Sequence, residues 1–331
     1  MSQEISEIGG YFGLQLLPLE DASRYMASPF LHKFQSARAS LFALLREINP
    51  PSIWLPKFLC DSMIDAALTH GTEVKYYDLT KNLCVNEGVA LKPGELLLFV
   101  NYFGLCATSQ KDAIERFGAE NIILDHSQAF FDGMDNVFAV IKSPRKFFPV
   151  PDGGLFFSRA LTCRAYDKDV SSINRMHHLL QRAAFNAKEG YSSFLEAEKS
   201  LNDCAPLEMS NLSQRMLEAS DFLSARLKRN ENFLMLHDVF KNVNQFPIMF
   251  DEIDGPLCYP LMISKENLRR DLIEAKVFIP TYWNEVLRRV APNSIEAKLV
   301  SDCIAIPCDQ RYGQDQMFYL ASLIKGKLDE Y

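Results

Sequence analysis

The feature that most constrains the fold is an alternation of strand-like and helix-like segments over residues 36–160. Short apolar runs rich in β-branched and aromatic residues are separated by stretches in which apolar side chains recur with helical spacing. The expected strands span 52–56, 73–79, 95–104, 121–124, 138–143 and 154–158, and the expected helices span 37–47, 58–70 and 109–117. Because strand–helix–strand repeats build parallel sheets, this pattern predicts a mainly parallel sheet, of the seven-stranded type, between helices.

The alternation ends near residue 160 and gives way to helical stretches at 170–200 and 213–230. A smaller unit follows, with expected strands at 257–263, 277–280 and 303–307 and expected helices at 265–276 and 313–329. A chain of 331 residues is long enough for two domains. We therefore predict an α/β fold with a large domain, residues 1–210, and a small C-terminal α+β domain, residues 211–331.

Composition and charge indicate which partners and which cellular compartment to expect. The net charge is −7, and no Lys/Arg cluster interleaves with aromatic residues, so nucleic acid is not an expected partner. No segment approaches the ~18 consecutive apolar residues of a membrane span, and the first residues, MSQEISEIGG, lack a secretory signal. We expect a cytoplasmic protein with reduced thiols at its eight scattered cysteines: Cys60, Cys84, Cys106, Cys163, Cys204, Cys258, Cys303 and Cys308.

Two polar groups stand where parallel strands should end, which is where open sheets bind ligands. Asp125 follows the apolar run NIIL directly, and Lys146 follows FAVIK within SPRK. A lysine and a carboxylate at neighbouring strand ends suit an aldehyde cofactor with a pyridine ring. The lysine forms the Schiff base, and the carboxylate keeps the ring nitrogen protonated. A structural ion pair at the sheet edge would place the same two residue types together, so their positions leave both interpretations open.

A resemblance favours the cofactor. SPRKFFPVPDGGLFFS resembles the cofactor-lysine segment of the DegT/DnrJ/StrS-type sugar aminotransferases, with Lys146, Asp152, Gly153 and Gly154 at matching offsets. LDHSQAF is similar to that family's Asp-x-Ala-Gln/His-Ala segment, and FQSARASLFALL resembles its phosphate-binding helix start. LPKFLCDSMIDAALTHGTEVKYYDL resembles the next strand–helix–strand unit, and CIAIPCDQRYGQDQM resembles the C-terminal strand and last helix. With gaps, the likeness runs over most of the chain.

The resemblance implies the aspartate-aminotransferase fold (fold type I), pyridoxal 5′-phosphate (PLP) as the cofactor, and sites formed between the two subunits of a homodimer. Lys146 would hold PLP and then move a proton as a base. Asp125 would pair with the pyridine nitrogen, and Gln128 would lie beside the ring hydroxyl. The phosphate would be held at a helix start by Ser36, Ala37 and Arg38, and by Ser143.

This sequence departs from the family at two places. Ala37-Arg38 replaces the usual Gly-Thr of the phosphate helix, and Arg38 either binds the phosphate or caps a surface. The ring-stacking aromatic aligns near Cys60, which cannot stack; Phe58, Tyr102 and Phe103 are nearby, although a place in the core or behind the site is the simpler interpretation of each.

Three further residues are weaker candidates for contacts with the substrate. Tyr282 and Trp283 follow VFIP in a segment that resembles the lining of the family's substrate cleft, but core packing is an equal interpretation. Arg311 is a possible contact for an anionic donor, although a solvated surface position is the simpler expectation. The adjacent His177 and His178 would point about 100° apart on a helix, so no metal site is expected there.

The resemblance therefore predicts a PLP-dependent aminotransferase that moves an amino group from an amino acid such as glutamate to a keto sugar linked to a nucleotide. Another PLP enzyme, an amino-acid transaminase or a dehydratase, is an alternative, but the family's sugar dehydratases carry histidine in place of the lysine. A non-catalytic relative that keeps the fold as a binding or scaffold module is a third possibility, supported by the altered phosphate helix and the missing aromatic.

Overall fold

The computed structural model describes residues 11, 13–133, 136–160, 165–248 and 253–329. The first ten residues and Cys163, considered above, lie outside this part of the chain. Within it, a seven-stranded sheet runs in the order β1-β7-β6-β5-β4-β2-β3. Its strands are β1 (Leu31–Phe34), β2 (Ser52–Pro56), β3 (Glu73–Tyr77), β4 (Leu96–Val100), β5 (Ile122–Asp125), β6 (Ala139–Lys142) and β7 (Gly154–Ser158).

The sheet is parallel except at β7, which runs antiparallel to both of its neighbours, β6 and β1. The carboxyl ends of all the other strands therefore lie at one edge of the sheet, together with the amino end of β7. The central strands β4 and β5 are buried along their whole length, which is why they appear in the sequence as continuous apolar runs. This architecture confirms the predicted mainly parallel α/β sheet.

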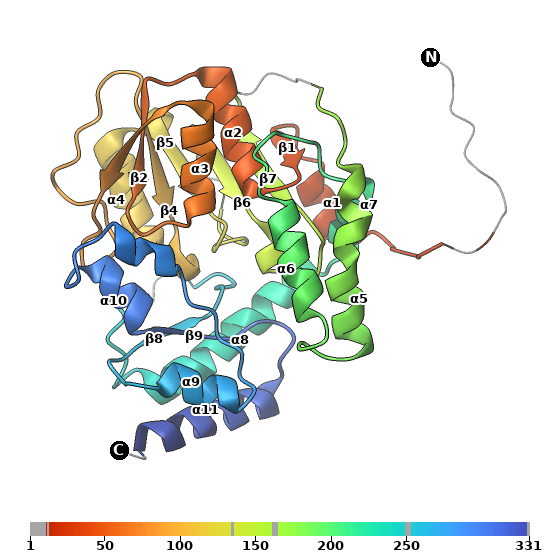
Figure 1. Cartoon of the computed structure of the whole chain (residues 1–331), viewed down its shortest axis with the longest axis vertical. Coiled ribbons are helices and arrows are strands. Elements are labelled where there is room, and N and C mark those ends of the chain that lie inside the picture. Colours follow the sequence, from red (N-terminus) through yellow and green to blue (C-terminus); the bar gives the residue numbers. More distant parts are fainter. Residues whose placement is uncertain (1–10, 12, 134–135, 161–164, 249–252, 330–331) are drawn as a thin grey trace.

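Helices cover both faces of this sheet. Figure 1 shows α2 (Ala37–Ile48) beside α3 (Asp61–His70) on one face, and these two helices pack against each other. The chain crosses from β1 to β2 and on to β3 in one direction along the sheet, then from β4 to β5 in the opposite direction. Because such crossovers are right-handed, α4 (Ala107–Phe117) lies on the other face.

The remaining helices surround this core and a second, smaller sheet. Strands β8 (Tyr259–Met262) and β9 (Cys303–Ile306) pair antiparallel, and Figure 1 shows them below the large sheet, between it and α9 and α11. The other helices are α1 (Glu20–Met26), α5 (His177–Ala184), α6 (Tyr191–Ser200), α7 (Asn211–Glu218), α8 (Phe222–Phe240), α9 (Leu268–Glu274), α10 (Ile295–Ser301) and α11 (Gln314–Asp329). The division into domains at residue 210 stays a prediction.

The structure differs from the sequence-based expectation at residues 277–280, which form no strand. The backbone N–H of Val277 instead donates to the carbonyl of Leu272, so this segment closes the end of α9. Strand β1 and helices α1 and α10 were not expected from the sequence. Among the described residues, no helix is both long enough and apolar enough to cross a membrane.

Candidate functional site

Two of the predicted site residues lie at the carboxyl end of β5. Asp125 is the last residue of the strand and is 3% exposed; its Oδ1 accepts the backbone N–H of Ser127 at 2.8 Å. Gln128, in the turn that follows, is 1% exposed, and its Oε1 accepts the backbone N–H of Phe103 at 2.8 Å. The Nε2 group of Gln128 is buried and has no partner among the described residues. Because buried donors are almost always paired, this side chain is suited to donating to a bound ligand.

Lys146 comes from the neighbouring strand, β6, through the short 3-10 turn Pro144–Lys146. Its side chain is exposed and forms no hydrogen bond or ion pair within the part of the chain that the structure describes. Lys142 differs in both respects, because it is buried and its Nζ donates to the carbonyls of Phe130 at 2.9 Å and Asp132 at 2.6 Å. Of these two lysines, only Lys146 offers an available amine.

Electrostatics at Cys60 indicate that Lys146 and Asp125 face the same region. Cys60 precedes α3, just beyond the carboxyl end of β2. Burial raises the pKa of its thiol above the usual range, while the Lys146 amine lowers that pKa and the Asp125 carboxylate raises it. Both charges are therefore close enough to this thiol to influence it, at the edge of the sheet where β2, β5 and β6 end.

The start of α2 lies at the same edge of the sheet. Ser36 caps the helix, with its hydroxyl accepting the N–H of Ala39 at 3.2 Å, and Ala37 is the first helical residue. The Nη1 group of Arg38 donates to Oδ1 of Asn202 at 3.0 Å, and its guanidinium has no carboxylate partner among the described residues. The first helix turn therefore combines backbone N–H groups with a cation that no acidic side chain neutralises, which is the chemistry of an anion site.

Two glycines allow α2 to approach this edge. The N–H of Gly153 donates to the carbonyl of Gln35 at 2.8 Å, and the φ of Gly153 is +142°, a value that side-chain-bearing residues rarely adopt. At Gly154, an added Cβ would lie 2.2 Å from the carbonyl oxygen of Ser36. The two glycines thus pack directly against Ser36, the residue that caps α2.

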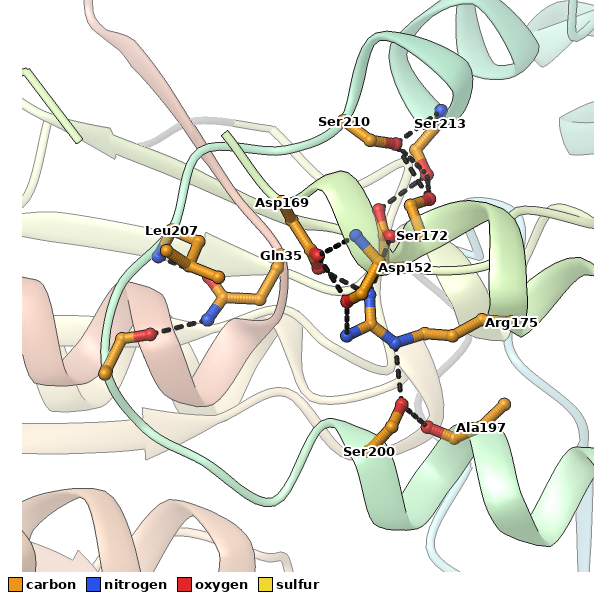
Figure 2. A network of polar contacts seen from close by, with 12 residues as sticks. Gln35, Asp152, Asp169, Ser172, Arg175, Ala197, Ser200, Leu207, Ser210 and Ser213 are labelled. Carbon is orange, nitrogen blue, oxygen red and sulfur yellow. Dashed lines mark hydrogen bonds and ion pairs between the residues drawn. The ribbon is translucent and has the colours of Figure 1, made fainter. Parts of the chain in front are cut away.

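Asp152 has a supporting role in this turn. Figure 2 shows its buried carboxylate accepting from the hydroxyl of Ser213 at 2.5 Å and from Nη1 of Arg175 at 3.1 Å. Arg175 also pairs with Asp169 and donates to Ser200 at 2.7 Å. Burial is the main influence on Asp152 and raises the pKa of its carboxyl. This network ties the loop between Lys146 and Gly153 to α6 and α7.

Arg145 is a charged residue at the site that the sequence analysis did not single out. It forms an ion pair with Glu198 of α6 and is close enough to Arg38 for the two positive charges to interact. Burial, with a smaller contribution from Arg38, lowers its pKa to about 10. In the sequence, only the position of Arg145 next to Lys146 indicates that it lies near the site. Its partner Glu198 is too far along the chain for the ion pair to be predicted.

The candidates for substrate contact lie in two different settings. The ring of Trp283 lies 5.0 Å from the ring of Phe58, and the ring of Tyr282 lies 5.9 Å from that of Phe103. Since Phe58 and Phe103 follow β2 and β4, this segment reaches the edge of the sheet at which these strands end. The guanidinium of Arg311 is already paired with the carboxylate of Asp309, with contacts of 2.7 and 2.8 Å.

The aromatic residues near Cys60 belong to the core. Phe58, Tyr102 and Phe103 are each at most 1% exposed, and the Tyr102 hydroxyl donates to the carbonyl of Phe58 at 2.7 Å. Cys60 itself is partly buried, with its Sγ 3.1 Å from the hydroxyl oxygen of Ser62. The position aligned with the family's stacking aromatic therefore carries a thiol.

Comparison with known proteins identifies solved structures that have a similar fold. No family model matches the chain, and neither does any curated protein. Among solved structures, it is similar to a DegT DnrJ EryC1 StrS aminotransferase from Brucella abortus, at 15% identity and a TM-score of 0.64, covering 93% of this chain and 88% of that one. The sugar aminotransferase CalS13 from Micromonospora echinospora has 13% identity and a TM-score of 0.65, with 92% and 89% covered. PseC of Helicobacter pylori, an aminotransferase involved in the biosynthesis of pseudoaminic acid, has 13% identity and a TM-score of 0.65, with 94% and 90% covered. The chain therefore has the fold of these aminotransferases.

Proposed function

We propose that this chain is a PLP-dependent aminotransferase that transfers an amino group from an amino acid such as glutamate to a keto sugar linked to a nucleotide. The observation that carries the proposal is that an exposed amine, Lys146, and a buried carboxylate, Asp125, come from the ends of two adjacent strands. These strands belong to a sheet with the fold of the aminotransferases compared above. That edge of the sheet is where open α/β folds bind ligands.

The residues present fit PLP group by group. The aldehyde requires an available amine, and the Lys146 amine has no partner in the described part of the chain. The pyridine nitrogen requires a carboxylate, as at Asp125. The ring hydroxyl oxygen would satisfy the buried, unpaired Nε2 of Gln128. The phosphate would meet the amides of the first turn of α2, capped at Ser36 and opening with Ala37, together with Arg38 and the hydroxyl of Ser143. Cys60 does not fit the pyridine ring in this way, because a thiol offers no stacking face.

When bound, PLP would supply an aldehyde for imine formation and a ring that accepts the electron pair released at the substrate carbon. The chain's own residues would do the rest. Lys146 would hold the cofactor and then, as a free amine, move a proton to and from the substrate carbon. Asp125 would hold a proton on the ring nitrogen, since burial strengthens that ion pair relative to water. Gln128 and the start of α2 would fix the orientation of the ring and the phosphate.

The proposal extends to assembly, compartment and substrate contacts. A homodimer is supported by large apolar side chains that are exposed on α5, just after it and on α6, among them Leu180, Phe185 and Tyr191. A cytoplasmic location is supported by the seven described cysteines, all of them unpaired thiols. The domain boundary at residue 210 and the substrate contacts of Tyr282, Trp283 and Arg311 remain parts of this proposal, with Arg311 requiring release from Asp309.

The test is a spectrum of the purified protein with added PLP, followed by an amino-transfer assay. The protein should turn yellow, and glutamate should convert the bound cofactor to its amino form, which a nucleotide-linked keto sugar should reverse. A yellow protein that fails with keto sugars but accepts keto acids would indicate an amino-acid transaminase. A protein that binds no PLP would overturn the proposed function and favour a non-catalytic relative.

Arg38 should contribute strongly to the affinity for PLP. Its guanidinium stands in the first turn of α2, and no carboxylate of the described residues pairs with it. A charge-assisted hydrogen bond is worth about 1.5–3 kcal/mol. We expect Arg38→Ala to weaken PLP binding roughly ten- to a hundredfold, as measured by equilibrium titration. Pyridoxal, which lacks the phosphate, serves as the control and should bind both proteins alike. Equal PLP affinity in the two proteins would remove Arg38 from the phosphate site.

A further inference from the structure

Arg229, on α8, is a buried arginine whose donors bind backbone carbonyls and a glutamine, although the carboxylate of Asp309 is near enough to interact with its charge. It is 2% exposed, and no carboxylate forms an ion pair with it within the described ranges. Its Nη1 donates to the carbonyls of Pro256 at 2.9 Å and Leu257 at 3.2 Å, its Nε donates to Oε1 of Gln310 at 2.8 Å, and the guanidinium carbon lies 4.5 Å from the centre of the Phe147 ring. Burying a guanidinium is costly unless its donors are satisfied. These contacts therefore explain how the guanidinium of Arg229 can be buried in the core.

One branch from Arg229 leads to the predicted cofactor lysine. Gln310, which accepts from Arg229, donates its Nε2 to the backbone carbonyl of Phe147 at 2.6 Å. Phe147 directly follows Lys146 and also lies under the guanidinium of Arg229. Both the main chain and the ring of the residue after Lys146 are therefore held by this arginine, one indirectly and one directly.

The other branch leads to Gln128. The N–H of Leu257, whose carbonyl accepts from Arg229, donates to the carbonyl of Phe103 at 2.9 Å. The N–H of Phe103 in turn donates to Oε1 of Gln128 at 2.8 Å. This bond orients the Gln128 amide so that its unpaired Nε2 is left for the site. A chain of hydrogen bonds thus runs from Gln128 through Arg229 to the residue next to Lys146.

We propose that Arg229 is a positioning residue that sets Lys146 and Gln128 relative to each other, through Gln310 and Phe147 on one side and Leu257 and Phe103 on the other. The inference rests on the proposed function, because the relative placement of these two side chains matters only for a ligand that contacts both. Sites held by such a second layer of contacts keep their geometry, and a displacement of about 1 Å can cost on the order of a hundredfold in rate.

The test uses Gln310→Met, since Gln310 is partly exposed and methionine keeps its length while removing both hydrogen bonds. Arg229→Lys is a second variant that keeps the charge but loses the fork of donors. The matched control is Asn232→Ala. Asn232 lies one turn further along α8, and its Nδ2 donates to the carbonyls of Cys308, Asp309 and Tyr312, so it holds the same C-terminal segment without contacting Phe147.

Two measurements follow. In the cofactor-free protein, mass spectrometry measures how fast Lys146 is acylated relative to the other lysines. This rate reports the accessibility and the surroundings of the Lys146 amine. In the PLP-bound protein, the circular dichroism of the cofactor band and the separate kcat and KM values report its orientation. We expect Gln310→Met to change the Lys146 acylation rate, weaken the dichroic band and lower kcat roughly ten- to a hundredfold at a similar KM. Arg229→Lys should do the same, whereas Asn232→Ala should lower only the thermal stability.

Unchanged acylation and dichroism in Gln310→Met would overturn the positioning role, and so would equal changes in Asn232→Ala, because the effect would then be general loosening. If the wild-type protein binds no PLP, the proposed function fails separately, and the acylation rates alone then decide whether Arg229 and Gln310 set the Lys146 side chain.

Discussion

Replacement of Lys146 by alanine should abolish covalent attachment of PLP and stop amino transfer. Loss of the proton-transferring amine alone should cost on the order of 10²–10⁴-fold in rate, and loss of the covalent linkage adds to this. Borohydride reduction of the wild-type protein with PLP should fix the cofactor on the peptide that contains Lys146, as detected by mass spectrometry. The variant should show no such peptide, and its turnover with glutamate should fall to background.

Lys146→Arg is the matched control, because it keeps the positive charge but cannot form the linkage. It should lose labelling and turnover while keeping the same thermal stability, since the Lys146 side chain makes no hydrogen bond to the described residues that would be lost. A label on Lys142 would contradict the assignment. The structure makes that outcome unfavourable, because the Lys142 amine is buried and donates to two backbone carbonyls.

Asp125→Asn should retain the fold and some affinity for PLP but lose on the order of a thousandfold in kcat, equivalent to about 4 kcal/mol. An amide is neutral, so it cannot hold a proton on the ring nitrogen, and the ring accepts electrons less well. The asparagine Oδ1 can still accept the N–H of Ser127, which is why the protein should remain folded. Turnover assays and thermal denaturation of the same preparation separate the two effects. Turnover near that of the wild type would remove Asp125 from the mechanism.

Most of the sheet could be predicted because its central strands carry their own signal. In β4 and β5 every residue is buried, so the apolar run and the strand coincide. The edge on which Asp125 and Lys146 lie then followed from the parallel arrangement, since Asp125 ends one strand and Lys146 follows another. Their roles stay predictions, because the fold fixes where the side chains lie and not what they bind.

Other parts could not be predicted, because their structure depends on distant partners. Strand β1, with the sequence LHKF, has one buried residue, Phe34, and no alternation that marks a strand. Its extended form comes from pairing with β7, more than a hundred positions along the chain, as Phe34↔Gly154 shows. Arg229 stands in the charged stretch ARLKRNENF, which is typical of a solvent-facing helix surface. Arg229 is buried because Pro256, Leu257, Gln310 and Phe147, all distant in the sequence, pack around it.

The pairing of β1 with β7 also determines when this part of the sheet can form during synthesis of the chain. β1 lies at the edge of the sheet and has β7 as its one neighbouring strand. At ~5–20 residues per second, on the order of ten seconds pass between the emergence of the two strands from the ribosome. During that interval β1 is an unpaired edge, and the start of α2 lacks the glycines against which it docks. The start of α2, which we propose holds the phosphate, therefore reaches its final packing only after β7 has been synthesised.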